Sequence, residues 1–71
     1  MKPGDLRRFH DDAFFANEKH LNGKVFMIVE ITPNNEHPSV PHATILVDGV
    51  LDDDWFYRIL EDNSEPVEVD G

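Results

Sequence analysis

The sequence predicts a mainly β fold, a single small barrel of five short strands. Three features of its 71 residues favour this: an apolar, β-branched run over residues 24–31, an Asp48-Gly49 pair between two further apolar runs, and strict alternation over residues 66–70. A chain this short has room for one hydrophobic core, so residues 1–71 are expected to form one domain. The apolar content of 39% is sufficient to fold it.

The N-terminal third is predicted to begin with a short strand, and the segment after it allows two interpretations. Residues 5–9 are predicted to be extended because their apolar stretch ends so soon. Residues 10–22 fit either a short helix or a long, partly ordered loop. In both cases Phe14 and Phe15 are expected at the edge of the core.

Residues 24–31 are predicted to form the central strand. Strand periodicity places Phe26, Ile28 and Glu30 on one face. The opposite face then holds Val25, Met27, Val29 and Ile31. Both faces are mostly apolar, so both are expected to be at least partly covered.

The following loop and hairpin are the clearest local features. Residues 32–42 contain three prolines, which remove backbone donors and predict an exposed loop. Residues 43–47 and 50–52 are predicted to pair through a type I′ turn at Asp48-Gly49, since glycine adopts a positive φ freely and aspartate tolerates it.

The C-terminal third is predicted to contain one helical turn and an edge strand. Residues 52–60 open with acids and continue with bulky apolar residues at three- and four-residue spacing, which favours a helical turn capped by Asp53 or Asp54. Residues 66–70 alternate as an edge strand facing water on one side does.

Charge narrows the class of partner. The net charge is −9, from 15 acidic and 6 basic residues, and from Asp48 onward Arg58 is the only base. Nucleic-acid binding requires Lys and Arg to neutralise phosphates, so no nucleic-acid partner is expected. The acidic charge fits either a basic partner or a protein that avoids aggregation. The longest apolar run, residues 25–29, is far short of the roughly 20 residues that cross a bilayer, so no membrane contact is expected.

No catalytic, cofactor or metal site is expected, and the chain is predicted not to be an enzyme. The absence of cysteine excludes thiolate ligands and nucleophiles. His10, Asp11, Asp12 and His20 are metal-ligating types, but their spacing matches no motif and ordinary loop or cap roles are favoured. Neither a glycine-rich phosphate loop nor a nucleophile elbow is present.

The candidate protein-binding site is the aromatic triplet Trp55, Phe56 and Tyr57 with the preceding acids Asp52, Asp53 and Asp54. Aromatic side chains dominate binding hot spots, and three in a row cannot all enter one small core. The alternative is structural: Trp55 or Phe56 packs inward and Tyr57 half-covers the end of the barrel.

Three segments resemble small SH3-like barrel proteins encoded by tailed bacteriophages: the opening at residues 1–6, the hairpin at residues 46–50 and the turn at residues 55–60. Together with the pattern of five short strands, a long first loop and a tight hairpin between strands three and four, the resemblance covers most of the chain. It implies a five-stranded SH3-like barrel with a long first loop and one helical turn before the last strand. It also implies a phage accessory or virion-associated protein, in the host cytoplasm or the virion, and transfers no catalytic residue.

Two functional hypotheses follow. The first is a non-enzymatic protein-interaction module for a host or virion partner. The alternative is an acidic nucleic-acid mimic that inhibits a basic host protein, motivated by the acidic C-terminal third. Exposed edge strands add the expectation of a homodimer.

Overall fold

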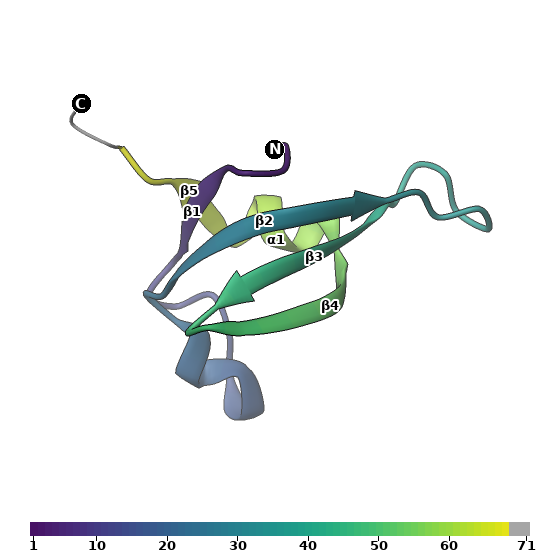
Figure 1. Ribbon diagram of the computed structural model, residues 1–71. Helices are drawn as coiled ribbons and strands as arrows, with labels where there is room; N and C mark the ends of the chain where they lie inside the picture. Colours follow the sequence, from purple (N-terminus) through teal and green to yellow (C-terminus); the bar gives the residue numbers. More distant parts are fainter. Residues whose placement is uncertain (69–71) are drawn as a thin grey trace.

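The computed structural model describes residues 1–68, and their fold is mainly β (Figure 1). Its elements in chain order are β1 (Leu6–Phe9), η1 (Ala16–Leu21), β2 (Val25–Thr32), β3 (His42–Val47), β4 (Val50–Phe56), α1 (Tyr57–Asp62) and β5 (Ser64–Pro66). The strands form one antiparallel sheet in the order β4-β3-β2-β1-β5. The predicted mainly β class and the helical segment before the last strand are confirmed.

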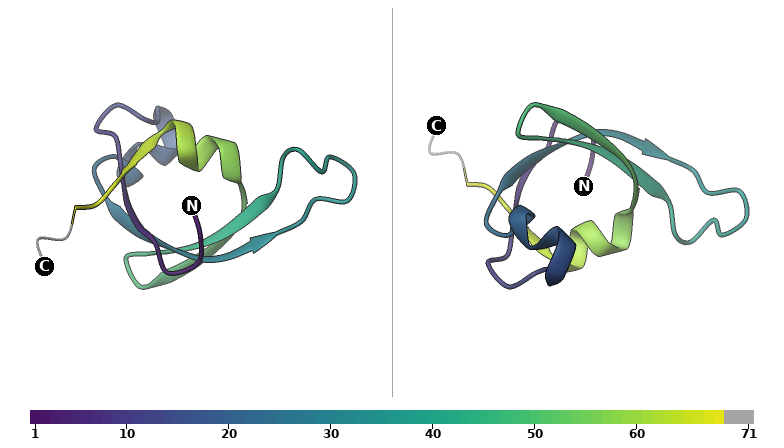
Figure 2. Two further views of the ribbon diagram at one scale, coloured as in Figure 1. Left: turned by 90° about the horizontal axis from the view of Figure 1, so that it is seen from above. Right: turned by 90° about the horizontal axis from the view of Figure 1, so that it is seen from below.

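The sheet is curved but open. Figure 2 shows it bending around the interior, with α1 lying across from β2. The chain passes from β4 into α1 at once, and α1 contacts both β4 and β5. Within residues 1–68 no strand pairing joins β4 to β5, so the five strands form an open sheet that does not close into a barrel. The physical reason is that a helix lies between the two edge strands and prevents a ladder there.

The β3–β4 hairpin has the predicted turn. Asp48 and Gly49 have φ values of 53° and 75°, the left-handed conformation that a type I′ turn requires at both central positions. Residues 33–41 form the predicted exposed loop. The side chain of Asn34 orders it, since Oδ1 accepts hydrogen bonds from the backbone N–H groups of Glu36 (3.1 Å) and His37 (3.2 Å).

A bulge in β2 corrects the predicted strand faces. Ile28 pairs with Ile45 and Glu30 with Thr44, so Val29 is an extra residue without a counterpart on β3. The bulge reverses the alternation beyond it. Ile31 therefore packs against the core, on the face that Phe26 and Ile28 share, and not with Val25 and Met27 as periodicity alone predicted.

A helical turn over residues 52–60 was predicted, and this is wrong for its first half. Residues 52–56 belong to β4, where Asp52 pairs with Ile45 and Trp55 with Ala43. The helix begins only at Tyr57 and has no side-chain cap at its N-terminus, so neither Asp53 nor Asp54 acts as one. Pairing with β3 overrides the local helical spacing.

The C-terminal strand lies earlier than predicted. β5 occupies Ser64–Pro66 at the edge of the sheet and pairs with β1. Val67 and Glu68 follow outside it, and the rest of the predicted strand, residues 69–70, lies outside the described part of the chain. Its place as an edge strand is confirmed.

The core lies between the sheet and the two helices. Its buried members are Phe9, Leu21, Phe26, Ile28, Ala43, Ile45, Val47 and Leu60. Phe14 packs on Phe9 edge to face, with ring centroids 5.0 Å apart, as predicted for the core edge. Phe15 is 82% exposed, and its predicted place is wrong. The backbone at Phe15 is extended, so adjacent side chains point to opposite sides.

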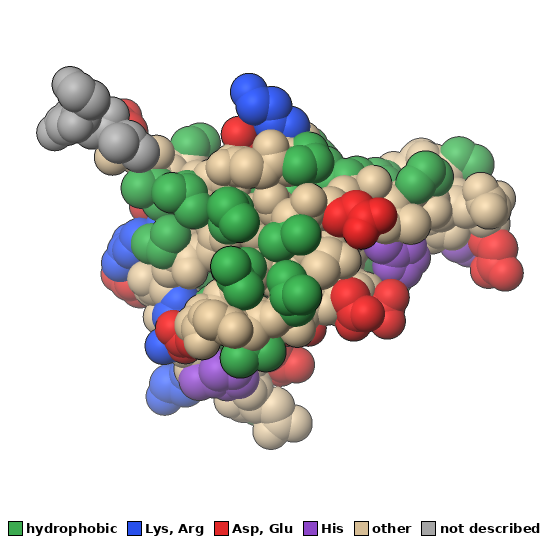
Figure 3. Space-filling view, in the orientation of Figure 1, with side chains coloured by type: hydrophobic (Ala, Val, Ile, Leu, Met, Phe, Trp, Pro, Cys, Tyr) green, Lys and Arg blue, Asp and Glu red, His purple; other side chains and the backbone are tan. Residues whose placement is uncertain are grey.

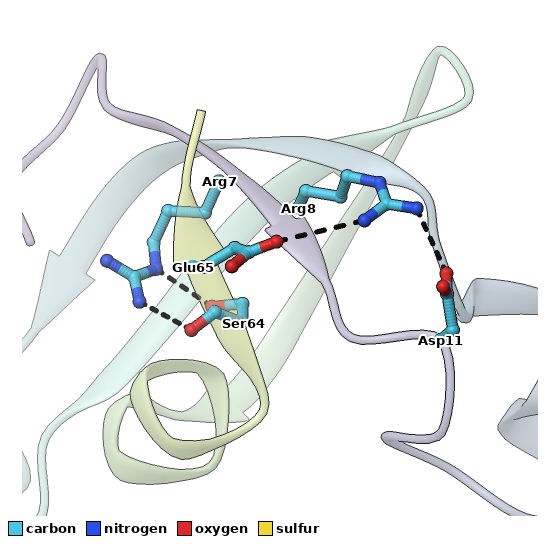
Figure 4. Close-up of polar contacts among 5 residues, drawn as sticks. All are labelled: Arg7, Arg8, Asp11, Ser64 and Glu65. Atoms are coloured by element: carbon cyan, nitrogen blue, oxygen red, sulfur yellow. Dashed lines mark hydrogen bonds and ion pairs between the residues drawn. The ribbon is translucent and has the colours of Figure 1, made fainter. Parts of the chain in front are cut away.

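Two arginines of β1 hold neighbouring segments (Figure 4). Arg7 donates from Nε to Ser64 Oγ and from Nη2 to the Ser64 carbonyl oxygen, each at 2.8 Å. Arg8 pairs with Asp11 at 3.0 Å and with Glu65 at 3.8 Å. These contacts fasten the short strand β5 and the segment after β1 to the sheet.

Candidate functional site

A shallow groove of about 400 Å³ lies between β4, η1 and α1. Its carboxylates are Glu18, Asp52, Asp53 and Asp54. Its apolar lining consists of Leu21, Trp55, Phe56 and Ile59. His20 and Asn17 of η1 complete it. We call it the acidic–aromatic groove, and it contains five of the six residues that the sequence predicted for protein binding.

A second bulge, in β4, positions the acids. The register with β3 shifts between Ala43 and Ile45, where two steps on β3 correspond to three on β4. Asp54 takes a φ of 63°, a left-handed conformation that aspartate tolerates better than most residues. As a result Asp53 and Asp54 are both exposed, while Asp52 is half-buried. The three acids therefore line one wall of the groove instead of capping a helix.

Trp55 joins the groove to the core. Its indole is half-buried, with ring centroids 5.8 Å from Phe9 and 5.7 Å from Phe14. This is the inward packing that the structural alternative described. Phe56 is 44% exposed and lies beside His42, with ring centroids 5.1 Å apart. The accessible aromatic surface of the triplet is therefore mainly that of Phe56.

Tyr57 does not line the groove. Its side chain is half-buried, and its hydroxyl accepts a hydrogen bond of 2.7 Å from the amino group of Met1. This hydrogen bond therefore joins Met1 to Tyr57, the first residue of α1. The structure assigns Tyr57 to holding the fold together, and it is the one member of the predicted site that the groove leaves out.

The charge of the groove is negative and uncompensated. None of its four carboxylates forms an ion pair with Lys or Arg within residues 1–68, and no Lys or Arg lines it. Four acids elsewhere in the described residues do form ion pairs, among them Asp48 with Lys24 at 2.6 Å and Asp62 with Arg58 at 3.7 Å. The groove is therefore suited to a cationic ligand.

The predicted metal-ligating types do not converge. Among residues 1–68 no three His, Asp or Glu side chains gather closely enough to hold a metal ion. Asp11 pairs with Arg8, and His20 faces the acidic–aromatic groove from η1. The buried hydroxyl of Ser64 donates to the Leu60 carbonyl oxygen and accepts from Arg7, so it serves the packing of β5.

Glu18 and Ile59 are groove residues that the sequence did not single out. Glu18 is more than 30 positions away from the β4 acids and comes from a segment whose structure the sequence left open. No local pattern links such distant residues, because the curvature of the sheet brings η1 next to β4. Ile59 was read only as part of a helical spacing.

No helix in residues 1–68 has the length and apolar character needed to cross a membrane. Comparisons with protein-family models, with curated proteins and with solved structures give no match.

Proposed function

We propose that this chain is a non-enzymatic protein-interaction module whose acidic–aromatic groove binds a basic, partly apolar segment of another protein. The observation that carries the proposal is the set of four unpaired carboxylates around exposed apolar side chains. Complementary charge speeds encounter and selects the partner, and the aromatic contact stabilises the complex.

The chemistry of the groove favours arginine in the partner. A guanidinium is planar, bonds carboxylates in pairs and stacks on aromatic faces, whereas an ammonium group acts as a point charge. Phe56 supplies an accessible ring next to Asp53 and Asp54, and Ile59, 40% exposed, adds apolar surface. A volume of about 400 Å³ suits a few side chains of a peptide.

The proposal includes an SH3-like fold and a phage origin. The strand order β4-β3-β2-β1-β5, the long segment between β1 and β2, and the helix between β4 and β5 support the first. The resemblance of three sequence segments to tailed-phage barrel proteins supports the second. On this basis the partner is a host or virion protein, and the chain acts in the host cytoplasm or in the virion.

The acidic half of the groove is tested by peptide selection. A random peptide library displayed against the purified chain is expected to yield arginine-rich sequences that also contain an aromatic or aliphatic residue. The variant D52N/D53N/D54N preserves side-chain shape and removes three charges, and should weaken binding of the selected peptides at least about tenfold. Neutralising three exposed acids outside the groove, in D12N/E61Q/E68Q, should change it less than about threefold. Selected peptides without basic residues, or equal losses in both variants, would reject the proposal.

A test of the apolar half of the groove requires changes at residues that do not support the fold. Trp55 packs on the core and Tyr57 bonds to Met1, so their removal mixes binding with stability. Phe56→Ala with Ile59→Ala removes exposed apolar surface, and should weaken the same peptides at least about tenfold. Val50→Ala, at a 62% exposed position outside the groove, is the control and should bind as wild type does.

The second candidate is an acidic nucleic-acid mimic. The net charge of −9 and exposed acids beyond the groove, such as Glu61 and Glu68, support it. A mimic uses charge over a wide surface, so D12N/E61Q/E68Q should then weaken binding of a basic partner as much as D52N/D53N/D54N does. Binding should also fall steeply as salt rises. If binding of the partner weakens only in D52N/D53N/D54N, the mimic is excluded.

A further inference from the structure

The outer face of the sheet, which points away from the core, carries an apolar row across four strands. Leu6 pairs with Met27, Met27 with Leu46, and Leu46 with Leu51. Directly paired residues lie on the same face of a sheet. We call these four residues the outer row. Leu6 and Leu51 are 42% and 64% exposed, and Figure 3 shows apolar side chains gathered in the middle of this face.

The helices do not cover the outer row. Figure 2 shows α1 and η1 both on the other side of the sheet, where the core lies. Val25 and Val29 extend the apolar surface along β2, at 47% and 37% exposure. An antiparallel sheet with one free face normally alternates apolar and polar residues. A contiguous apolar patch in place of that polar face marks an interaction surface.

We infer that a second copy of this chain packs on this face, sheet against sheet, about a two-fold axis parallel to the outer row. Under this symmetry each outer row meets its counterpart, so the same four residues supply both sides of the contact. Packed sheets lie about 10 Å apart with interdigitating side chains, which the leucines and Met27 allow. None of the four outer-row residues lines the acidic–aromatic groove.

Charge selects the direction of the axis. Glu30, exposed and paired with Thr44, lies on the outer face beyond one side of the row. Arg8, paired with Val25, lies beyond the other side, and its side chain is 43% exposed. Glu30 lies level with Thr44, two residues from Leu46, and Val25 is two residues from Met27, so at about 3.3 Å per residue both lie about 7 Å from the row. A two-fold axis along the row brings Glu30 of one copy toward the Arg8 side of its partner.

An axis along the strands would instead bring the Glu30 side chains of both copies to the same end of the contact, which like-charge repulsion disfavours. Arg8 already pairs with Asp11 and Glu65 on the surface, but its guanidinium has five N–H donors and can donate to a further carboxylate. Glu30 makes no ion pair of its own within residues 1–68.

Sedimentation equilibrium on the full chain, from about 1 μM to about 1 mM, tests the inference. The wild type should approach twice the monomer mass of 8.2 kDa. Leu51→Asp should weaken association at least about a hundredfold, because a symmetric dimer contains the change twice. Val50→Asp is the matched control. Val50 is equally exposed, at 62%, but it pairs with the buried Val47, on the opposite face, and its variant should associate as wild type does.

The axis has its own test. Glu30→Lys should weaken association about tenfold or more, whereas Glu36→Lys in the 33–41 loop changes the net charge equally and should not. Circular dichroism checks that each variant is folded. A wild type that stays monomeric at all concentrations assigns the face to another occupant and overturns the inference. Equal association of the Leu51 and Val50 variants, or of the two lysine variants, overturns the face or the axis.

Discussion

Phe9 is the residue whose replacement by alanine should lower the free energy of unfolding most. It is fully buried, its ring stacks on Phe26 with centroids 4.3 Å apart, and it contacts Phe14 and Trp55. Replacing a buried phenylalanine by alanine costs about 3–5 kcal/mol, from lost burial plus the cavity left behind. Domains are stable by about 0.05–0.15 kcal/mol per residue, or about 4–11 kcal/mol for this chain. Phe9→Ala should therefore remove a large part of the free energy of unfolding.

Urea unfolding measures this loss directly, because Trp55 is the single tryptophan and reports on the core through its emission. With a slope of about 1 kcal/mol/M, the unfolding midpoint should fall by about 3–5 M, or the protein should be unfolded without urea. Phe15→Ala deletes the same atoms from an 82% exposed position and should stay within about 0.5 kcal/mol of wild type. A loss under about 1 kcal/mol for Phe9→Ala, or similar losses for both variants, would refute this account of the core.

Three further predictions concern the turn, the edge strand and the loop. Gly49→Ala should cost about 1 kcal/mol and lower the thermal midpoint by about 4–8 °C, purely through its φ of 75°, since an added Cβ would meet no atom within 4 Å. Ser64→Ala should cost about 1–2 kcal/mol in urea unfolding, because it removes an acceptor for Arg7, while Ser39→Ala in the exposed loop should cost nothing measurable. Asn34→Ala should speed hydrogen exchange at Glu36 and His37, whereas Asn35→Ala should not.

Stability and the proposed binding share one residue. Trp55 lines the acidic–aromatic groove with one part of its ring and packs on Phe9 and Phe14 with another. A core change such as Phe9→Ala should therefore alter the groove, whereas groove changes at Phe56 or Ile59 should leave the core intact. Loss of binding in a Trp55 variant is therefore not by itself evidence that Trp55 contacts the partner.

The candidate site was only partly predictable. The run of acids and aromatics identified one wall of the groove, because both residue types are adjacent in the sequence. The inward packing of Trp55 and the bond between Tyr57 and Met1 depend on partners far away in the chain. The opposite wall, with Glu18 and His20, comes from a segment whose structure local patterns left undecided.

By itself the sequence determined the mainly β class, the exposed loop, and the turn at Asp48-Gly49, because each depends on the conformational preferences of neighbouring residues. Only the tertiary structure decided the open sheet, the strand conformation of residues 52–56 and the change of face at Ile31. The open sheet follows from the position of α1 between β4 and β5. The other two features follow from pairing with β3, where one-residue register shifts produce two bulges. Nothing within β2 or β4 specifies where its partner strand will skip a residue.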